Sequence, residues 1–212
     1  MGVKQKSISL KRQNHELSDT FYQLKVLNAQ ESSPNNFVSF TEKVGRQIKP
    51  SQLDILQINI GKLCNQSCAH CHVDAGPDRK EENMDRKALE KCLAIIDAYD
   101  IKTVDITGGA PEMNPHFRWF VEECSRLGVH IMNRCNLTII MAHEKYSDLP
   151  EFFAKHKVQV ISSLPYFTKL RTDSQRGQGV FNDSTEALKK LNAIGYGQPN
   201  SDLQLDLVYN PS

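Results

Sequence analysis

Three of the six cysteines lie close together in the sequence, in the segment Cys64-Asn-Gln-Ser-Cys68-Ala-His-Cys71. Thiolates are soft ligands that suit iron–sulfur clusters and zinc. On a loop of this length, three thiolates can each bind one iron of a cubane cluster and leave the fourth iron open to a small molecule. The Cys-x3-Cys-x2-Cys spacing therefore predicts a [4Fe–4S] cluster held by Cys64, Cys68 and Cys71.

Structural zinc is the alternative reading of these cysteines, with His70 or His72 completing a Cys3His tetrahedron. Zinc sites usually have a second pair of ligands further along the chain, and no Cys-x2-Cys or His-x3-His pair follows here. A trio of packed structural cysteines is a third reading. We favour the cluster.

A second motif, Thr107-Gly-Gly-Ala-Pro-Glu112, follows an expected strand at 103–107. Paired glycines let the backbone approach a ligand closely, and active sites of parallel barrels lie at the carboxyl ends of the strands. Glycines after a strand are often only turn residues. Together with the cysteine loop after the preceding strand, however, they indicate a site at that end of a sheet.

Apolar and β-branched runs alternate with helical spacing from residue 53 onward. We expect strands over 53–60, 103–107, 130–133, 158–163 and 203–209, and helices over 84–99, 115–128, 150–156 and 182–194. This alternation predicts an α/β fold with a parallel sheet, which right-handed crossovers would curl into most of a barrel or an open arc. Because no helix follows the last strand, we expect a chain truncated at its C-terminal end.

The composition bounds the class of protein. With 212 residues, of which 39% are hydrophobic, the chain is long and apolar enough to bury a core. Its net charge of only +1 argues against a protein that coats nucleic acid or an anionic membrane. Apolar runs fall far short of the roughly 18–20 residues that span a bilayer, and no signal peptide opens the sequence. We expect a soluble cytoplasmic protein with a basic, polar extension over 1–50, partly disordered around 31–36, and a core domain over 51–212.

Six motifs, taken in order, resemble the radical S-adenosylmethionine (SAM) enzymes, and more closely the radical SAM/Cys-rich subgroup that includes the arsenosugar-biosynthesis radical SAM proteins. The resemblance covers residues 53–211. The motifs are Cys64-Asn-Gln-Ser-Cys68-Ala-His-Cys71-His-Val-Asp-Ala-Gly-Pro77, Asp105-Ile-Thr-Gly-Gly-Ala-Pro-Glu112, Asn133-Arg-Cys-Asn-Leu-Thr138, Gln175-Arg-Gly-Gln-Gly-Val-Phe181, Leu191-Asn-Ala-Ile-Gly-Tyr-Gly197 and Leu205-Asp-Leu-Val-Tyr-Asn-Pro211.

The resemblance implies a partial TIM-like (β/α)6 barrel of which this chain holds about five units; family members continue into a sixth unit and a cysteine-rich region. It implies a [4Fe–4S] cluster and SAM as cofactors, and an electron donor such as flavodoxin or ferredoxin. Reductive cleavage of SAM would yield a 5′-deoxyadenosyl radical, which in the arsenosugar branch adds to a methylated trivalent arsenical. A peptide or another small-molecule substrate, or a truncated cluster-binding fragment without activity, are the alternatives.

The resemblance also assigns residues to SAM. Gly108, Gly109 and Glu112 would meet the methionyl amino group. Arg176 would pair with the carboxylate, a role that suits a planar cation.

Ser163 would touch the ribose, and His70 would lie near the adenine. Arsenic(III) is thiophilic, so Cys135 is the candidate substrate ligand, with a packed cysteine at a strand end as the equal alternative. Cys92 and Cys124 lie on apolar helix faces, where we expect them to belong to the core.

Overall fold

The computed structural model describes residues 9–28, 45, 52–68 and 71–209. The chain divides into two compact units, one of residues 10–53 and one of residues 1–9 with 54–212. In the smaller unit, the 3₁₀ helix η1 (Glu16–Ser18) precedes helix α1 (Thr20–Asn28). The segment 31–36, for which disorder was predicted, lies outside the described residues.

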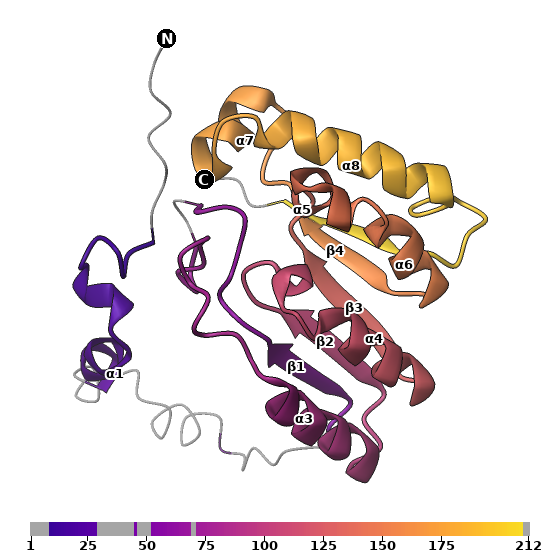
Figure 1. Ribbon diagram of the computed structural model, residues 1–212, viewed down its shortest axis with the longest axis horizontal. Helices are drawn as coiled ribbons and strands as arrows, with labels where there is room; N and C mark the ends of the chain where they lie inside the picture. The colour runs from indigo at the N-terminus through magenta and orange to yellow at the C-terminus, as the bar shows by residue number, and fades with distance from the viewer. Residues whose placement is uncertain (1–8, 29–44, 46–51, 69–70, 210–212) are drawn as a thin grey trace. The chain divides into compact units, whose positions relative to one another are not determined.

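A sheet of five parallel strands forms the larger unit (Figure 1). The strands follow one another in chain order as β1 (Ile55–Asn59), β2 (Thr103–Thr107), β3 (His130–Cys135), β4 (Gln159–Ser163) and β5 (Leu205–Val208). This open sheet confirms the predicted α/β fold. The prediction ended the third strand at Asn133, but β3 continues to Cys135 and pairs there with Ser162 of β4.

Helices connect the strands and pack along the sheet (Figure 1). The four that contribute most to the core are α3 (Arg86–Ala98), α4 (Phe117–Arg126), α6 (Leu149–Lys155) and α8 (Val180–Ile194). Shorter elements are η2 (Pro111–Met113), α5 (Ile139–Ala142), η3 (Glu144–Tyr146) and α7 (Lys169–Arg176). None of these short elements was predicted, and α7 carries a residue of the site described below.

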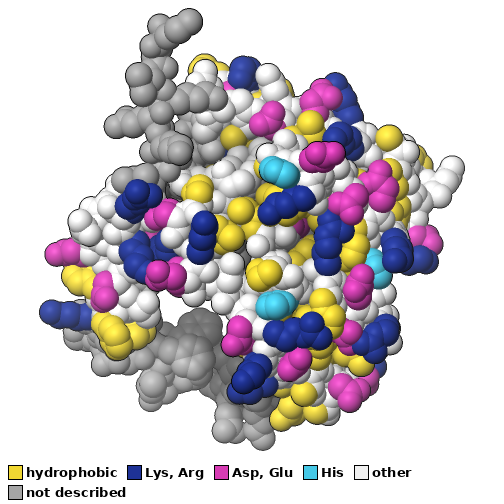
Figure 2. Space-filling view, viewed as in Figure 1, with side chains coloured by type: hydrophobic (Ala, Val, Ile, Leu, Met, Phe, Trp, Pro, Cys, Tyr) yellow, Lys and Arg dark blue, Asp and Glu magenta, His cyan; other side chains and the backbone are white. Residues whose placement is uncertain are grey.

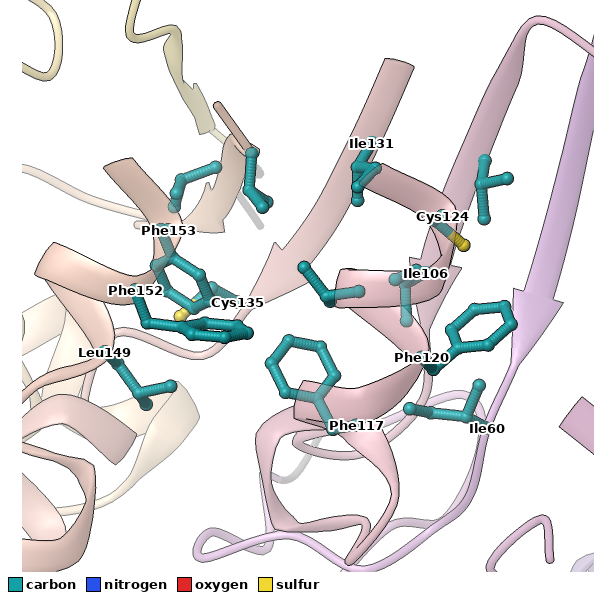
Figure 3. Packing of buried hydrophobic residues seen from close by; sticks show 14 of the residues in the cluster. Ile60, Ile106, Phe117, Phe120, Cys124, Ile131, Cys135, Leu149, Phe152 and Phe153 are labelled. Carbon is teal, nitrogen blue, oxygen red and sulfur yellow. The ribbon is translucent and has the colours of Figure 1, made fainter. Parts of the chain in front are cut away.

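The apolar core lies between one face of the sheet and these helices. Ile106 of β2 lies between the rings of Phe117 and Phe120 from α4, and Ile131 of β3 is buried in the same cluster (Figure 3). Burying a large apolar side chain contributes about 1.5–3 kcal/mol, so this contact fixes α4 on the sheet. Cys124 is fully buried in the same cluster and Cys92 packs partly buried against it, as expected from the sequence.

Side chains alternate between the two faces of a strand, so the residues between the core positions point to the opposite, inner face. Asn59, Arg134 and Ser163 occupy such positions and are exposed. The inner face therefore carries exposed polar side chains at the carboxyl ends of the strands, whereas the side chains of the opposite face are buried under the helices.

The described surface carries both signs of charge. On the face shown in Figure 2, Lys and Arg side chains are interspersed with Asp and Glu. None of the described helices has the length and apolarity needed to cross a membrane.

Candidate functional site

A cavity of about 300 Å³ opens at the carboxyl ends of the strands. Its walls come from the loop after β1, from Thr107–Gly109 after β2, from the ends of β3, β4 and β5, and from α7. The sequence predicted a site at this edge. The cavity brings together seven of the predicted cluster and SAM residues and the substrate candidate Cys135; the seven are Cys64, Cys68, Cys71, Gly108, Gly109, Ser163 and Arg176.

The loop that carries the three cysteines is held by its own backbone. The Cys64 N–H donates to Gly76 O at 3.2 Å, and the Gly76 N–H donates to Lys62 O at 3.0 Å. These two bonds tie the start of the loop to its end. The cysteines between them therefore lie on a closed loop and not on a free segment.

A buried arginine stabilises the returning half of this loop. Arg79 is 3% exposed, and its guanidinium donates to Asp74 O at 3.0 Å and to Glu82 Oε1 at 2.7 Å. It also pairs with the Asp74 carboxylate. Because a charge this deeply buried is costly unless it is paired, the pairing holds residues 74–82 in one arrangement.

The thiols are free, and backbone and side-chain N–H groups point at their sulfurs. Cys64 Sγ accepts from the Gln66 N–H at 3.5 Å and from Asn136 Nδ2 at 3.8 Å, and Cys71 Sγ accepts from the Ala75 N–H at 3.2 Å. Burial raises the pKa of the Cys64 thiol to about 11. The Cys64 thiol is therefore protonated at neutral pH without metal, and a bound metal would displace its proton.

This donor set fits an iron–sulfur cluster. Three soft thiols line one cavity, and N–H groups aimed at sulfur are the surroundings that tune such clusters. Within the part of the chain that the structure describes, no three His, Cys, Asp or Glu side chains are close enough to hold a single metal ion. Of the histidines considered for zinc, His72 lines the cavity and His70 lies outside the described residues.

The glycine pair after β2 allows the cysteine loop to pack against the sheet. A Cβ on Gly109 would lie 2.6 Å from Leu63 O, and one on Gly108, whose φ is +150°, would lie 2.5 Å from Gly61 O. In place of those clashes, the Gly109 N–H donates to Gly61 O and the Ala110 N–H donates to Leu63 O, both at 2.9 Å. The sequence predicted that this backbone closely approaches a ligand; the structure shows it in close contact with the chain's own cysteine loop.

Arg176, at the end of α7, lies 9% exposed in the cavity wall. Its Nη2 donates to Asn136 Oδ1 at 3.2 Å and to Gln66 Oε1 at 3.3 Å. Its buried Nε has no acceptor among the described residues. A buried N–H without an acceptor in a cavity wall is a ready contact for an anionic ligand.

Asn136 connects Arg176 to the cysteine loop, because its Nδ2 donates to Asn65 Oδ1 at 2.8 Å as well as to Cys64 Sγ. Sequence reasoning placed Asn136 beside Cys135 but gave it no role. Its position in the Asn133–Thr138 motif was the only signal.

The remaining predicted residues lie in different surroundings. Ser163 is exposed at the end of β4, and His70 lies outside the described residues. Cys135 contributes to the cavity wall, but it is 2% exposed and its sulfur lies within the aromatic core (Figure 3). Glu112 does not line the cavity; its Oε1 accepts from Asn133 Nδ2 at 2.6 Å. Burial raises the pKa of the Glu112 carboxyl, although hydrogen bonds from its own backbone, Asn133 and Cys135 oppose this.

A second arginine, Arg134, lies on the inner face of β3 and also lines the cavity. It pairs with Asp105 through two nitrogens, with Nε 2.9 Å from Oδ1 and Nη2 2.8 Å from Oδ2. Gln57 Nε2 donates to the same Asp105 Oδ2 at 2.6 Å. Three neighbouring strands thus contribute one hydrogen-bonded chain.

Comparison with solved structures shows the same fold in larger proteins. Streptococcus suis SuiB is 18% identical, with a TM-score of 0.56, and the match covers 86% of this chain and 40% of that one. The structure of Streptococcus suis SuiB bound to S-adenosylmethionine is 17% identical, with a TM-score of 0.57 and coverage of 86% and 41%. Native anSMEcpe with bound AdoMet is 16% identical, with a TM-score of 0.56 and coverage of 73% and 43%.

This chain therefore spans about two fifths of the length of these structures. No curated protein matches the sequence. The sequence matches the radical SAM superfamily over residues 58–203, from β1 to the segment before β5. Members of that superfamily use a [4Fe–4S] cluster and SAM. A match over most of the chain, on a fold shared with SAM-bound structures, shows that this chain belongs to the radical SAM superfamily.

Proposed function

We propose that this protein is a radical SAM enzyme in which Cys64, Cys68 and Cys71 hold a [4Fe–4S] cluster. The observation that carries the proposal is one cavity lined by three soft thiols and by a buried arginine with an unused N–H. When bound, the cluster supplies the electron that cleaves SAM to a 5′-deoxyadenosyl radical. The protein's part is to hold SAM in a fixed orientation and to exclude water.

The residues of the cavity wall are assigned to SAM as the family resemblance implies. Arg176 binds the carboxylate through Nε, because that N–H has no other acceptor among the described residues. Gly108 and Gly109 present backbone to the methionyl amino group, and Ser163 contacts the ribose.

His70 contacts the adenine by resemblance alone. Glu112 lies outside the cavity wall. Its carboxyl accepts a hydrogen bond from Asn133 and so fixes the turn after β2. This is a positioning role, in place of direct contact with SAM.

The proposed substrate is a methylated trivalent arsenical, to which the radical adds as in the arsenosugar branch that the sequence resembles. Cys135 is the proposed thiol ligand for arsenic. A peptide substrate is the second candidate, since SuiB, which shares the fold, has been crystallised with the precursor peptide SuiA. Flavodoxin or ferredoxin is the proposed electron donor, and a reducing compartment such as the cytoplasm suits the free thiols.

The test is anaerobic reconstitution followed by incubation with SAM and a chemical reductant, with and without dimethylated arsenic(III). We expect 5′-deoxyadenosine, and with the arsenical a product that contains both arsenic and the adenosyl carbon skeleton, detected by mass spectrometry. Cleavage of SAM without an arsenic-dependent product would redirect the substrate assignment to peptides or other small molecules. No cleavage of SAM by the reconstituted wild type would contradict the proposed activity itself.

A further inference from the structure

We propose that the cavity contains a second anion site, centred on Arg134, which binds a carboxylate or other oxyanion group of the substrate. The inference rests on the proposed function, because that function assigns the first arginine of the cavity, Arg176, to SAM. It names the substrate class: a small molecule with an apolar part and one anionic oxygen group.

The guanidinium of Arg134 is held in one orientation before any ligand binds. Asp105 accepts from both Nε and Nη2, and Gln57 holds the same carboxylate from the other side. The Asp105 side chain is 4% exposed and does not line the cavity, so the cavity wall contains the guanidinium but not its carboxylate partner. A fixed guanidinium loses little conformational freedom on binding, which favours affinity.

Arg134 has donors left over for a ligand. A guanidinium has five N–H groups, and the pair with Asp105 uses those on Nε and Nη2. Nη1 has no acceptor among the described residues, and the side chain is 44% exposed. Its register partner in β4 is Ile161, which lines the same cavity, as does Thr107 at the end of β2.

The charge of the cavity also favours an anion. Its described wall contains Arg134, Arg176 and His72 but no Asp or Glu. The proposed function uses Arg176 for the SAM carboxylate, which leaves the unpaired N–H donors of Arg134 for a second anion. Apolar side chains complete the wall near the inner face of the sheet, from Ile161, Pro165 and Val208.

The test measures anion binding directly on the cluster-loaded protein with SAM bound. Calorimetric titrations use acetate, inorganic phosphate and dimethylarsinate as anionic probes and acetamide as the neutral match for acetate. We expect at least one anion to bind, and acetamide to bind at least ten-fold more weakly than acetate. The strongest of the three probes distinguishes a carboxylate from a phosphate or an arsenical oxyanion as the natural group.

Two variants localise the site. In Arg134→Gln combined with Asp105→Asn, no buried carboxylate is left unpaired, and we expect anion affinity to fall at least ten-fold. Arg134→Lys keeps a point charge but not the planar fork, so we expect an intermediate loss. Arg118→Gln is the matched control, because Arg118 forms the same two-nitrogen pair with Asp148 outside the cavity; its anion affinity should equal that of the wild type.

Equal anion affinity in the wild type and the double variant would overturn the inference, because the Arg134–Asp105 pair would then be only a structural contact between strands. The inference would also be overturned if acetamide bound as tightly as acetate. SAM binding, recorded in the same samples, reports on the proposed function separately. If SAM does not bind, the proposed function fails, and the anion titrations still decide the role of Arg134.

Discussion

At the scale of single residues, Asn136 is the side chain through which the cysteine loop and Arg176 contact each other. It donates to Cys64 Sγ and Asn65 Oδ1 and accepts from Arg176. Its partners lie 72, 71 and 40 positions away in the sequence. Such a role depends on contacts that only the fold creates.

Changing Asn136→Ala should weaken the site without unfolding the protein. Loss of an N–H donor to sulfur lowers the reduction potential of a thiolate-bound cluster. Loss of the Arg176 acceptor leaves that guanidinium less well oriented, and we expect SAM affinity to fall about ten-fold, which corresponds to about 1.4 kcal/mol. A redox titration followed by EPR and a SAM titration check both effects. The exposed Asn182→Ala on α8 is the control; identical potentials in the two variants would contradict the role of Asn136.

The buried carboxyl of Glu112 leads to a prediction about how the stability of the protein depends on pH. Burial raises its pKa above the ordinary value of 4.5, so folding favours the neutral carboxyl. Its contribution to stability is therefore fully present below pH 4.5 and is lost as the pH rises through the raised pKa. Glu112→Gln cannot ionise, and the free energy of unfolding of the wild type should fall relative to this variant from acidic to neutral pH. Urea unfolding at a series of pH values measures it; parallel curves would show that Glu112 is not perturbed.

The role of a single residue could be predicted where the residues it acts with lie close to it in the sequence. The spacing of Cys64, Cys68 and Cys71 carries the cluster prediction, because the three residues share one loop. The orientation of Cys135 toward the aromatic core depends on which face of β3 the residue occupies. A third strand predicted to end at Asn133 could not provide this orientation.

At the scale of elements, the turn between α7 and α8 fixes Arg176. Gly177 and Gly179 both adopt positive φ, at +113° and +92°, immediately after Arg176. Asp173 then accepts from the Gly179 N–H and the Phe181 N–H, both at 3.0 Å, and so caps the start of α8. The C-terminal end of α7 is thereby attached to the longest helix of the described chain.

Removing this cap with Asp173→Ala should destabilise the protein by about 0.5–2 kcal/mol, the usual cost of losing an N-cap. Burial raises the pKa of the Asp173 carboxyl, but hydrogen bonds from Lys169 and from the two backbone N–H groups outweigh burial and lower that pKa below 3.8. The stability it contributes is therefore present above pH 3.8 and is lost as the pH falls through the lowered pKa. Thermal unfolding at neutral and acidic pH tests this, with a smaller difference between wild type and variant expected in acid. A difference that grows in acid would refute the assignment.

The glycine pair provides a second test at this scale. In Gly109→Ala the new Cβ would lie 2.6 Å from Leu63 O, so the cysteine loop must move. We expect iron incorporation on reconstitution to fall by at least half, together with a loss of about 1–3 kcal/mol of stability. In Gly128→Ala the φ of +72° is also strained, but nothing lies within 4 Å; this control should lose about 1 kcal/mol and keep its iron. Equal iron content in the two variants would show that Gly109 does not position the loop.

Helix α7 is an element that the sequence pattern did not predict. It has eight residues, is strongly polar, and its Leu170 is 81% exposed. Periodic apolar residues are the signal for a helix, and α7 lacks them because it buries Thr172 and Arg176 instead. The strands were easier, since Val104 and Ile106 in β2 are β-branched, alternate with polar residues and point into the core.

At the scale of the whole molecule, the alternation of strands and helices was enough to predict the architecture. The strand order β1-β2-β3-β4-β5 follows directly from successive right-handed crossovers. Because the carboxyl ends of parallel strands meet at one edge, the cysteine loop after β1 and the glycines after β2 had to come together. The volume of the cavity and the second arginine in it depend on side chains from β2 to β5, the cysteine loop and α7, and could not be predicted this way.

The central claim, that three cysteines hold a [4Fe–4S] cluster at which SAM binds, is tested most directly by measuring iron and the EPR spectrum after anaerobic reconstitution. We predict about four iron atoms per chain, as one cubane cluster requires, and a change in the spectrum of the reduced protein when SAM is added. Alanine at Cys64, Cys68 or Cys71 should abolish both, whereas Cys92→Ala, which alters a residue packed against the core, should retain them. A wild-type protein with no more iron than the Cys64→Ala variant, or a spectrum that SAM leaves unchanged, would contradict the account.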